Sequence, residues 1–462
     1  MDGSRAVTRR SFLKGTAAGV GSLTVLGAAN ANLAAAPVPA RWDQEVDVLI
    51  IGAGVAGCAA AIAASDAGET SILVLEKMPY PGGAGALSSG TVLAAGTVVQ
   101  KERGIQDSPE QWYQDVMRLS QNGVDPRMIR VIIDNSLDAF TFLYNAGLRW
   151  SNIDPLPGYT ADRCYREANG GAKLMKAILG EVKKRPGIKI VLDTKATRFI
   201  VDACGGPVPQ GEVLGVECVN EDGKKLAIKA RKGVGICTGD YSSNAAYIES
   251  HFPQLKGAKS VGHPGNTGDG IKMAQKVGAD VTGLVPEGHP HCVETAPGKV
   301  VLWCRYDMLS RSGLILVNKE GRRFCDEVER GHYVPLLPEV QKQPDVFFAA
   351  VFDQATAKRI AEDKRFATNF RGNTALFTKG LQGDGYLVKR AGSVEELAQK
   401  LGVPVDALKK TVAAYNAAAA KKQDAEFRRD GKYLFPLETP PFFGWKGALG
   451  IVETRGGLRI DP

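Results

Sequence analysis

The eight cysteines of this 462-residue chain include no Cys-x-x-Cys pair and no Cys-x-x-Cys-His motif. Structural zinc sites commonly pair cysteines at the first spacing, and covalent c-type haem attachment uses the second motif. We therefore predict no metal site and no covalently held haem. Cys58 and Cys237 lie in apolar segments and are expected to be small, buried thiols.

The chain also lacks the usual signs of a nucleic-acid-binding or membrane-spanning protein. Its basic runs, such as residues 183–185, have no interleaved aromatic residues, so we interpret them as solvated surface and predict no nucleic-acid partner. The uncharged stretch that begins at Gly15 is poor in Leu and Ile and contains Asn30 and Asn32, which disfavours a membrane anchor.

This N-terminal stretch has the composition of an export signal. Residues 8–14 read TRRSFLK, a twin-arginine pattern, and small residues follow at 29–31 and 34–36. Residues 1–36 are therefore predicted to be a Tat signal peptide with a cleavage site. The protein is expected to be periplasmic or otherwise extracytoplasmic, with no stable membrane span after cleavage; an uncleaved anchor is the alternative.

Length and charge set broad limits on the remainder. With 462 residues, of which 44% are hydrophobic and 23% charged, the chain can form two or three globular domains with a large core. Its formal charge of +8 suits an anionic small-molecule substrate.

One stretch carries the strongest functional signal. Residues 46–76 read VDVLIIGAGVAGCAAAIAASDAGETSILVLE, which predicts a strand, a glycine-rich turn, a helix and a second strand. In such a unit Gly52 permits the tight turn, Gly54 lets the backbone approach a pyrophosphate, and Gly57 allows close helix–strand packing. Glu76 is spaced to accept hydrogen bonds from a ribose 2′-OH, so FAD or NAD is predicted rather than NADP.

Further elements follow from pattern. Residues 109–146 and 172–184 are expected to be helical, and a hairpin is predicted around Asp222-Gly223, between strands at 213–220 and 225–230. Residues 393–421 are predicted to be helical, with a capping box at their start and a second helix that begins at Pro404.

Several motifs stand in an order that resembles one family. After GAGVAG and Glu76 come PGGAGALSSG, ICTGDYSSN, GNTGDGIKMAQKVGAD, His289-Pro290, LILVNKEGRRFCDE, SVEELAQKLGV, TVAAYN, PPFFG and TRGGLRID. The chain resembles the flavoprotein subunits of the fumarate reductase and succinate dehydrogenase family. It is most similar to the soluble periplasmic reductases and the 3-ketosteroid dehydrogenases of that family. The likeness covers nearly everything after residue 44.

The resemblance implies an α/β fold, in which an α+β capping domain is inserted into a Rossmann-like FAD-binding domain. The expected boundaries are 44–288 for the first part of the FAD-binding domain, 289–452 for the cap, and 453–462 for the start of the return to the FAD-binding domain.

The cofactor implied is FAD. It is expected to be non-covalent, because no His occurs in the loop after Gly83. An NAD-linked enzyme is the last-ranked alternative, since no second Gly-x-Gly-x-x-Gly unit exists for a nicotinamide site. The implied cofactor-binding residues are Gly52, Gly54, Ala56, Gly57, Glu76, Lys77, Gly82, Gly83, Ser88, Ser89, Gly90, Ala196, Thr238, Gly239 and Asp269.

The chemistry implied is hydride transfer from flavin N5 to an activated C=C bond of an organic acid or enone. A dehydrogenase that works in the reverse direction is an alternative. Such a site needs groups that polarise the substrate, an acid opposite the flavin, and exclusion of water. With no haem motif in the chain, electrons are expected from a separate cytochrome or quinol-linked protein.

Two residues are implied in proton delivery. The family's reductases use an arginine donor, and Arg330 lies near that position, one residue short of the usual spacing. The alternative is that Arg330 pairs with Glu329 or Glu327 on the surface. Asp307 matches an acid that resupplies the donor with protons, whereas the family's relay arginine falls at Ser310.

Two further positions bear on the substrate. His289 matches a substrate-binding histidine of the family, but Glu453 stands where the family has a second one. A carboxylate there is expected to repel a simple dicarboxylate and to accept a hydrogen bond from a hydroxyl, amine or imidazole. Phe443 lies close to the position of the catalytic tyrosine of the ketosteroid dehydrogenases, which argues against that chemistry.

The sequence stops at Asp461-Pro462, where members of the family continue for several dozen residues. Three interpretations follow: an incomplete gene product, a tail supplied by a partner chain, or a truncated, catalytically inactive FAD-binding protein.

Overall fold

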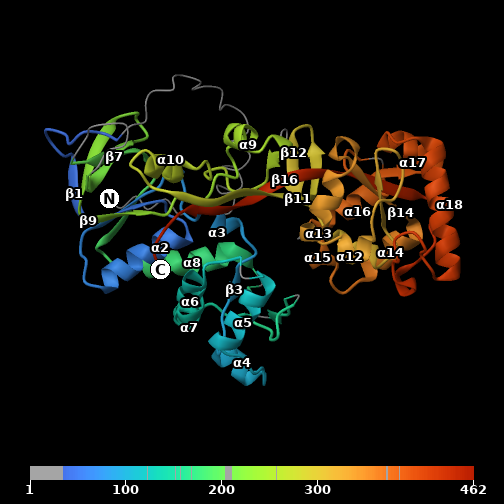
Figure 1. Ribbon diagram of the computed structural model, residues 1–462, viewed down its shortest axis with the longest axis horizontal. Coiled ribbons are helices and arrows are strands. Elements are labelled where there is room, and N and C mark those ends of the chain that lie inside the picture. The colour runs from blue at the N-terminus through green and yellow to red at the C-terminus, as the bar shows by residue number, and fades with distance from the viewer. Residues whose placement is uncertain are drawn as a thin grey trace.

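The computed structural model describes residues 35–462 except 122, 151, 157, 168, 203–210, 256–257, 371–372 and 384. The predicted Tat signal therefore lies almost wholly outside the described residues. Figure 1 shows an elongated molecule with a sheet at one end, a helical lobe beside it, and a second large sheet with its helices at the other end. Two long strands join the two ends.

The first sheet has six strands in the order β6-β2-β1-β9-β8-β7. β1 pairs in parallel with β2 and β9, so the predicted strand–helix–strand unit is confirmed, and β8 pairs antiparallel with β9 as the predicted hairpin. The strands are β1 (Gln44–Ile51), β2 (Ile72–Leu75), β6 (Ile188–Val191), β7 (Lys195–Val201), β8 (Val213–Val219) and β9 (Lys225–Ile236).

Helices α2 and α8 pack on this sheet because their buried side chains and those of the strands form one apolar core. Ile50, Cys58 and Leu174 are buried in one core between the sheet and helices α2 and α8. Cys58 is fully buried as predicted, whereas Cys237 is partly exposed. The helices of this part are α2 (Val55–Asp66), α3 (Gly83–Leu87), α8 (Gly170–Lys183), α9 (Ala245–His251) and α10 (Asp269–Gln275).

The adjoining lobe holds a three-stranded sheet, β3-β5-β4, and four helices. The predicted helical region 109–146 forms three of them. The elements are β3 (Thr91–Leu93), α4 (Val98–Glu102), α5 (Pro109–Leu119), α6 (Pro126–Asp134), α7 (Ser136–Asn145), β4 (Asn152–Asp154) and β5 (Cys164–Arg166).

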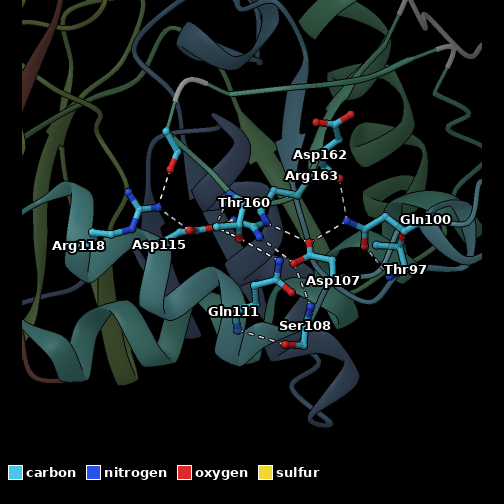
Figure 2. Close-up of polar contacts among 11 residues, drawn as sticks. Thr97, Gln100, Asp107, Ser108, Gln111, Asp115, Arg118, Thr160, Asp162 and Arg163 are labelled. Carbon is cyan, nitrogen blue, oxygen red and sulfur yellow. Dashed lines mark hydrogen bonds and ion pairs between the residues drawn. The ribbon is translucent and has the colours of Figure 1, made fainter.

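A buried ionic cluster holds this lobe together (Figure 2). Arg163 is fully buried and donates to Asp107 through Nη2 at 2.7 Å and to Asp115 through Nη1 at 2.7 Å. Asp115 also accepts from the N–H and the hydroxyl of Thr160. A buried guanidinium is tolerated when carboxylates compensate its charge, as they do here.

The second large sheet runs β12-β11-β16-β14-β13, with β10 and β15 also paired to β16. Its strands are β10 (Lys259–Ser260), β11 (Val281–Ala296), β12 (Lys299–Leu302), β13 (Ile315–Asn318), β14 (Phe348–Asp353), β15 (Lys389–Ala391) and β16 (Phe442–Leu458). β11 and β16 are antiparallel and form the ribbon that crosses the molecule in Figure 1. The predicted domain boundaries at 288/289 and 452/453 fall inside these two strands.

Helices surround the far half of this sheet. Ser393 caps α17 by accepting from the Glu396 N–H at 3.2 Å, and Gly402, with φ +71°, ends that helix. The predicted second helix follows as α18, with Pro404 as its N-cap. The helices are α11 (Tyr306–Ser310), α12 (Glu327–Arg330), α13 (Tyr333–Gln341), α14 (Gln354–Glu362), α15 (Phe366–Asn369), α16 (Thr374–Gln382), α17 (Val394–Leu401) and α18 (Val405–Lys421). The predicted α/β class is confirmed.

Candidate cofactor site and adjoining polar groups

A cavity of about 770 Å³ lies where β1, β2 and β9 end. Ligands bind at the carboxyl ends of parallel strands in open α/β sheets, so this is the expected position for a dinucleotide. Ten of the predicted cofactor residues line the cavity, and they are Gly52, Gly54, Ala56, Glu76, Lys77, Gly83, Ala196, Thr238, Gly239 and Asp269.

The three fingerprint glycines have different physical roles. A Cβ at Gly52 would lie 2.3 Å from the Cys237 carbonyl oxygen, and one at Gly57 would lie 1.8 Å from the Gly52 carbonyl oxygen. Both positions therefore require glycine for packing. A Cβ at Gly54 would meet no protein atom within 4 Å. Because Gly54 lines the cavity, its missing side chain leaves room for a ligand at the N-terminus of α2.

Glu76 is fixed at the end of β2. Its side chain is buried, its Oε2 accepts from the Ala53 N–H at 2.8 Å, and its Oε1 accepts from the Met78 N–H at 2.9 Å. Each carboxylate oxygen has a second lone pair, so both can accept a further hydrogen bond. The carboxylate is thus held in one position at the end of β2 and keeps lone pairs for further donors.

Lys77 and Asp269 form an ion pair on the cavity wall, with Nζ 2.7 Å from Oδ2. Lys195 Nζ lies 3.4 Å from the same oxygen, and the Thr267 hydroxyl donates to it at 2.9 Å. Burial by itself raises the pKa of Asp269. These partners, led by Lys77, lower it by a larger amount, so the pKa of Asp269 lies below its ordinary value. The two lysines exceed the Asp269 carboxylate by one positive charge at this part of the wall, which suits a diphosphate, while the carboxylates of Glu76 and Asp240 line other parts of the cavity.

The remaining predicted cofactor residues do not line the cavity. Gly57 packs the helix, and Gly82 and Gly90 have positive φ angles of +128° and +67°. Ser88 donates to the Gly85 carbonyl oxygen at 2.8 Å, and Ser89 bonds the Thr91 hydroxyl. These five residues, Gly57 and the four from 82 to 90, are outside the lining of the cavity.

Several cavity residues have no place in the predicted set. Lys195, Asp240, His263, Asn266 and Gly456 all line the cavity. Asp240 and Asn266 stand inside segments already noted for the resemblance, but Lys195 and His263 have no spacing that marks them. They line the cavity because the start of β7 and the loop before α10, which are distant in sequence, meet there.

His289 and Glu453 lie side by side on the ribbon of β11 and β16. The His289 Nε2 is 3.8 Å from the Glu453 Oε1, and His289 is buried whereas the Glu453 side chain is 54% exposed. Next to Glu453, the Thr454 N–H donates to Asp240 Oδ2 at 2.9 Å, which joins the ribbon to the loop after β9. The structure thus brings the two predicted substrate residues together beside the cavity.

Asp307 and Arg330 are placed differently from each other. Asp307 is buried and paired with Arg305, with Arg305 Nη2 2.7 Å from Oδ2. Arg330 is exposed at the end of α12, and it is Gly331 that packs on the backbone of Asp307.

The alternative for Arg330 is a surface ion pair with Glu329 or Glu327, and Glu327 is not available for it. The Glu327 carboxylate is buried and is held by Arg323 at 2.7 Å and Arg429 at 3.4 Å. The roles of Arg330 and Asp307 remain predictions.

The described part of the chain shows neither a membrane-spanning helix nor a cluster of metal-binding side chains. None of its helices is long and apolar enough to cross a bilayer. No group of three His, Cys, Asp or Glu side chains within it could hold a metal ion.

Comparisons with known proteins agree with this geometry. The family model for the FAD binding domain matches residues 47–462. The chain is 32% identical to the NADH:fumarate oxidoreductase of Klebsiella pneumoniae (strain 342) over 90% of its own length and 42% of that protein. It is 28% identical to the urocanate reductase of Eggerthella lenta, over 92% of the chain and 67% of that protein.

A solved structure is also similar. It is the open conformation of a flavocytochrome c3 fumarate reductase, which superposes with a TM-score of 0.75 at 25% identity over 99% of this chain and 72% of that one. The chain thus spans less than half of the Klebsiella protein, 67% of the urocanate reductase and 72% of the flavocytochrome chain.

The cavity fits FAD on structural grounds, because Gly54 leaves the backbone at α2 open, Glu76 is fixed for a ribose, and Lys77 and Lys195 supply positive charge. With the match over residues 47–462, the chain belongs to the FAD-binding domain family of fumarate reductase-like flavoproteins.

Proposed function

We propose that this protein is a periplasmic, Tat-exported, FAD-dependent oxidoreductase that reduces an activated C=C bond of an organic acid or enone. Family membership and relatives named for fumarate and urocanate support the reaction class. The twin-arginine pattern in residues 8–14 supports export.

The observation that carries the proposal is the His289–Glu453 pair. It lies on the ribbon whose continuation, Gly456 to Leu458, lines the cofactor cavity. A donor and an acceptor side chain, 3.8 Å apart beside a dinucleotide site, can orient a small polar substrate against the cofactor.

FAD, when bound, supplies the hydride through N5. His289 is proposed to donate a hydrogen bond to the carboxylate or carbonyl oxygen of the substrate, where negative charge develops as the C=C bond is reduced. Glu453 is proposed to accept a hydrogen bond from a hydroxyl, amine or imidazole at the other end of the substrate.

Proton delivery is proposed to depend on Asp307 and an arginine. The pKa of a free arginine is above about 12, so such a donor needs an acid beside it that resupplies the proton. Arg305 contacts Asp307 directly, which supports Arg305 in this role. Arg330, implied by the resemblance, is the alternative.

The remaining parts of the proposal concern the frame of the site. Residues 289–452 are proposed to form a cap that excludes water, between the two parts of the FAD-binding domain at 44–288 and 453–462. FAD is proposed to be non-covalent, and a cytochrome or quinol-linked protein is proposed to deliver the electrons.

The test begins with the full chain purified with its flavin. Acid precipitation should release the FAD into the supernatant, and the pellet should be colourless. Oxidation of reduced viologen is then followed with α,β-unsaturated acids and enones that differ only in a second substituent: carboxylate, hydroxyl, amine or imidazole.

We expect reduced viologen to be oxidised faster with the compounds that carry a hydroxyl, amine or imidazole than with the dicarboxylate. No oxidation with any compound, by protein that holds one FAD per chain, would overturn the proposal and favour a catalytically inactive flavin-binding protein.

A further inference from the structure

His263 lies in the loop between β10 and α10 and lines the cofactor cavity. It is only 4% exposed. Its carbonyl oxygen accepts from the Asn266 N–H at 2.9 Å and from the Ser243 hydroxyl at 2.8 Å, and its ring meets the ring of Tyr80 edge-on. Backbone and ring are therefore both held in one position.

The tautomer of His263 follows from one hydrogen bond. Nδ1 accepts from the Gly265 N–H at 3.1 Å, so Nδ1 carries no proton. Burial lowers the pKa of His263, which keeps the ring neutral at pH 7. A neutral imidazole carries one proton, so Nε2 is the donor.

This donor has no acceptor among the residues that the structure describes. The Nε2 atom of His263 is buried and makes no hydrogen bond with them. Buried polar groups in proteins are nearly always paired, and an orphan beside a binding cavity points to a partner that arrives with the ligand.

The surroundings of His263 indicate which half of the dinucleotide it faces. The charges that act on its ring come from Glu76, Lys77 and Asp240. Glu76 is the acid that marks the ribose in this type of fold, and Tyr80, which contacts His263, lies four residues after it. His263 therefore belongs to the adenosine side of the cavity.

We propose that His263 is a cofactor-positioning residue whose Nε2–H donates a hydrogen bond to an oxygen of the adenosine ribose–diphosphate half of FAD. The side chain complements Glu76, which can only accept: a ribose hydroxyl that donates to Glu76 keeps lone pairs for the His263 N–H. The proposal rests on FAD binding alone and is independent of the reaction proposed above.

Two substitutions separate the two ring nitrogens. His263→Asn places an amide oxygen near the position of Nδ1, so it keeps an acceptor for Gly265 and loses the donor at Nε2. His263→Gln places an amide N–H near the position of Nε2, so it keeps the donor and loses the acceptor. Affinities for FAD and for ADP, which carries only the adenosine half, are measured on the full chain after removal of flavin.

We expect H263N to bind both FAD and ADP about fivefold to tenfold more weakly than wild type, and H263Q to bind both within about twofold of wild type. Unchanged affinity in H263N, or a loss for FAD without the same loss for ADP, would overturn the assignment. If H263N does not fold, H263Q decides alone, because a tenfold loss in a variant that keeps the donor is incompatible with the proposal. Reductase activity plays no part in this readout.

Discussion

Arg305 donates to both carboxylate oxygens of Asp307, from Nη2 to Oδ2 at 2.7 Å and from Nε to Oδ1 at 3.2 Å. Asp307 is buried, so this pair is shielded from water on one side and open on the other, where 30% of the Arg305 side chain is exposed. An arginine held in this way can exchange a proton through its carboxylate partner, whereas Arg330 is exposed at the end of its helix.

The first prediction separates these two arginines. Arg305→Ala should lower kcat by about a hundredfold or more, because a positioned acid contributes on the order of 10²–10⁴ in rate. Arg330→Ala, the matched control, should leave kcat within about twofold. Both variants should retain FAD, measured by the visible spectrum. The opposite pattern would assign proton delivery to Arg330, as the resemblance implies.

The second prediction compares two glycines of one turn. Gly54→Ala should leave the unfolding temperature of the flavin-free protein nearly unchanged, because its Cβ meets no protein atom within 4 Å, but it should weaken FAD binding about tenfold or more. Gly57→Ala should destabilise the fold itself by about 2–4 kcal/mol, because its Cβ would lie 1.8 Å from the Gly52 carbonyl oxygen.

Thermal unfolding without flavin and FAD titration measure the two effects. Equal loss of stability in both variants would contradict the different roles assigned to Gly54 and Gly57.

The same turn shows what the sequence could predict. Gly52 to Glu76 is a continuous stretch with one pattern, and both its strands and its fixed acid appear in the structure. The hairpin at Asp222-Gly223 is equally local. Such features need no knowledge of distant contacts, because spacing and turn chemistry determine them.

The remainder depends on contacts that no local pattern reports. Lys195 contacts Asp269, which is 74 residues away in the sequence and also binds Lys77. His263 lines the cavity from the loop that precedes α10. Arg163 gave no signal in the sequence, because its partners Asp107 and Asp115 are 56 and 48 positions away. The pairing of Asp307 with Arg305 likewise depends on how α11 begins, which a motif match does not reveal.

The third prediction concerns the ionic cluster of Arg163. Asp115→Asn should destabilise the protein by about 3–5 kcal/mol at pH 7, because it leaves buried Arg163 with one carboxylate fewer. Glu110→Gln is the control, since Glu110 pairs with Arg130 on the surface, and it should leave the unfolding temperature nearly unchanged.

The cluster also predicts a pH dependence. Burial by itself raises the pKa of Asp115. Hydrogen bonds from Thr160, Arg163 and Arg118 lower it by a larger amount, so the pKa of Asp115 in the folded protein lies well below the ordinary value. A depressed carboxyl pKa adds stability above the unfolded pKa of about 3.9, and this stability is lost as the pH falls below that value toward the folded pKa. The unfolding temperature should therefore drop below about pH 4, and drop less steeply in D115N. Parallel pH profiles would contradict this.

The last prediction uses Glu453 to change substrate preference. In the wild type a carboxylate stands 3.8 Å from His289, so under the proposed substrate contacts Glu453 should repel the second negative charge of a dicarboxylate. Glu453→His replaces that acceptor with a side chain that can donate, and it should raise kcat/KM for fumarate about tenfold, which corresponds to about 1.4 kcal/mol. Because 54% of the Glu453 side chain is exposed, water screens part of the repulsion, and a larger gain is not expected.

Glu453→Gln removes the charge without supplying an imidazole, so its gain should be smaller, while its activity with a hydroxyl- or amine-bearing acid should fall. Viologen oxidation with the two substrates side by side measures the ratio. If E453H leaves that ratio unchanged while His289→Ala abolishes turnover, the substrate contacts His289 but not Glu453, and the acid on β16 has no part in selecting the substrate.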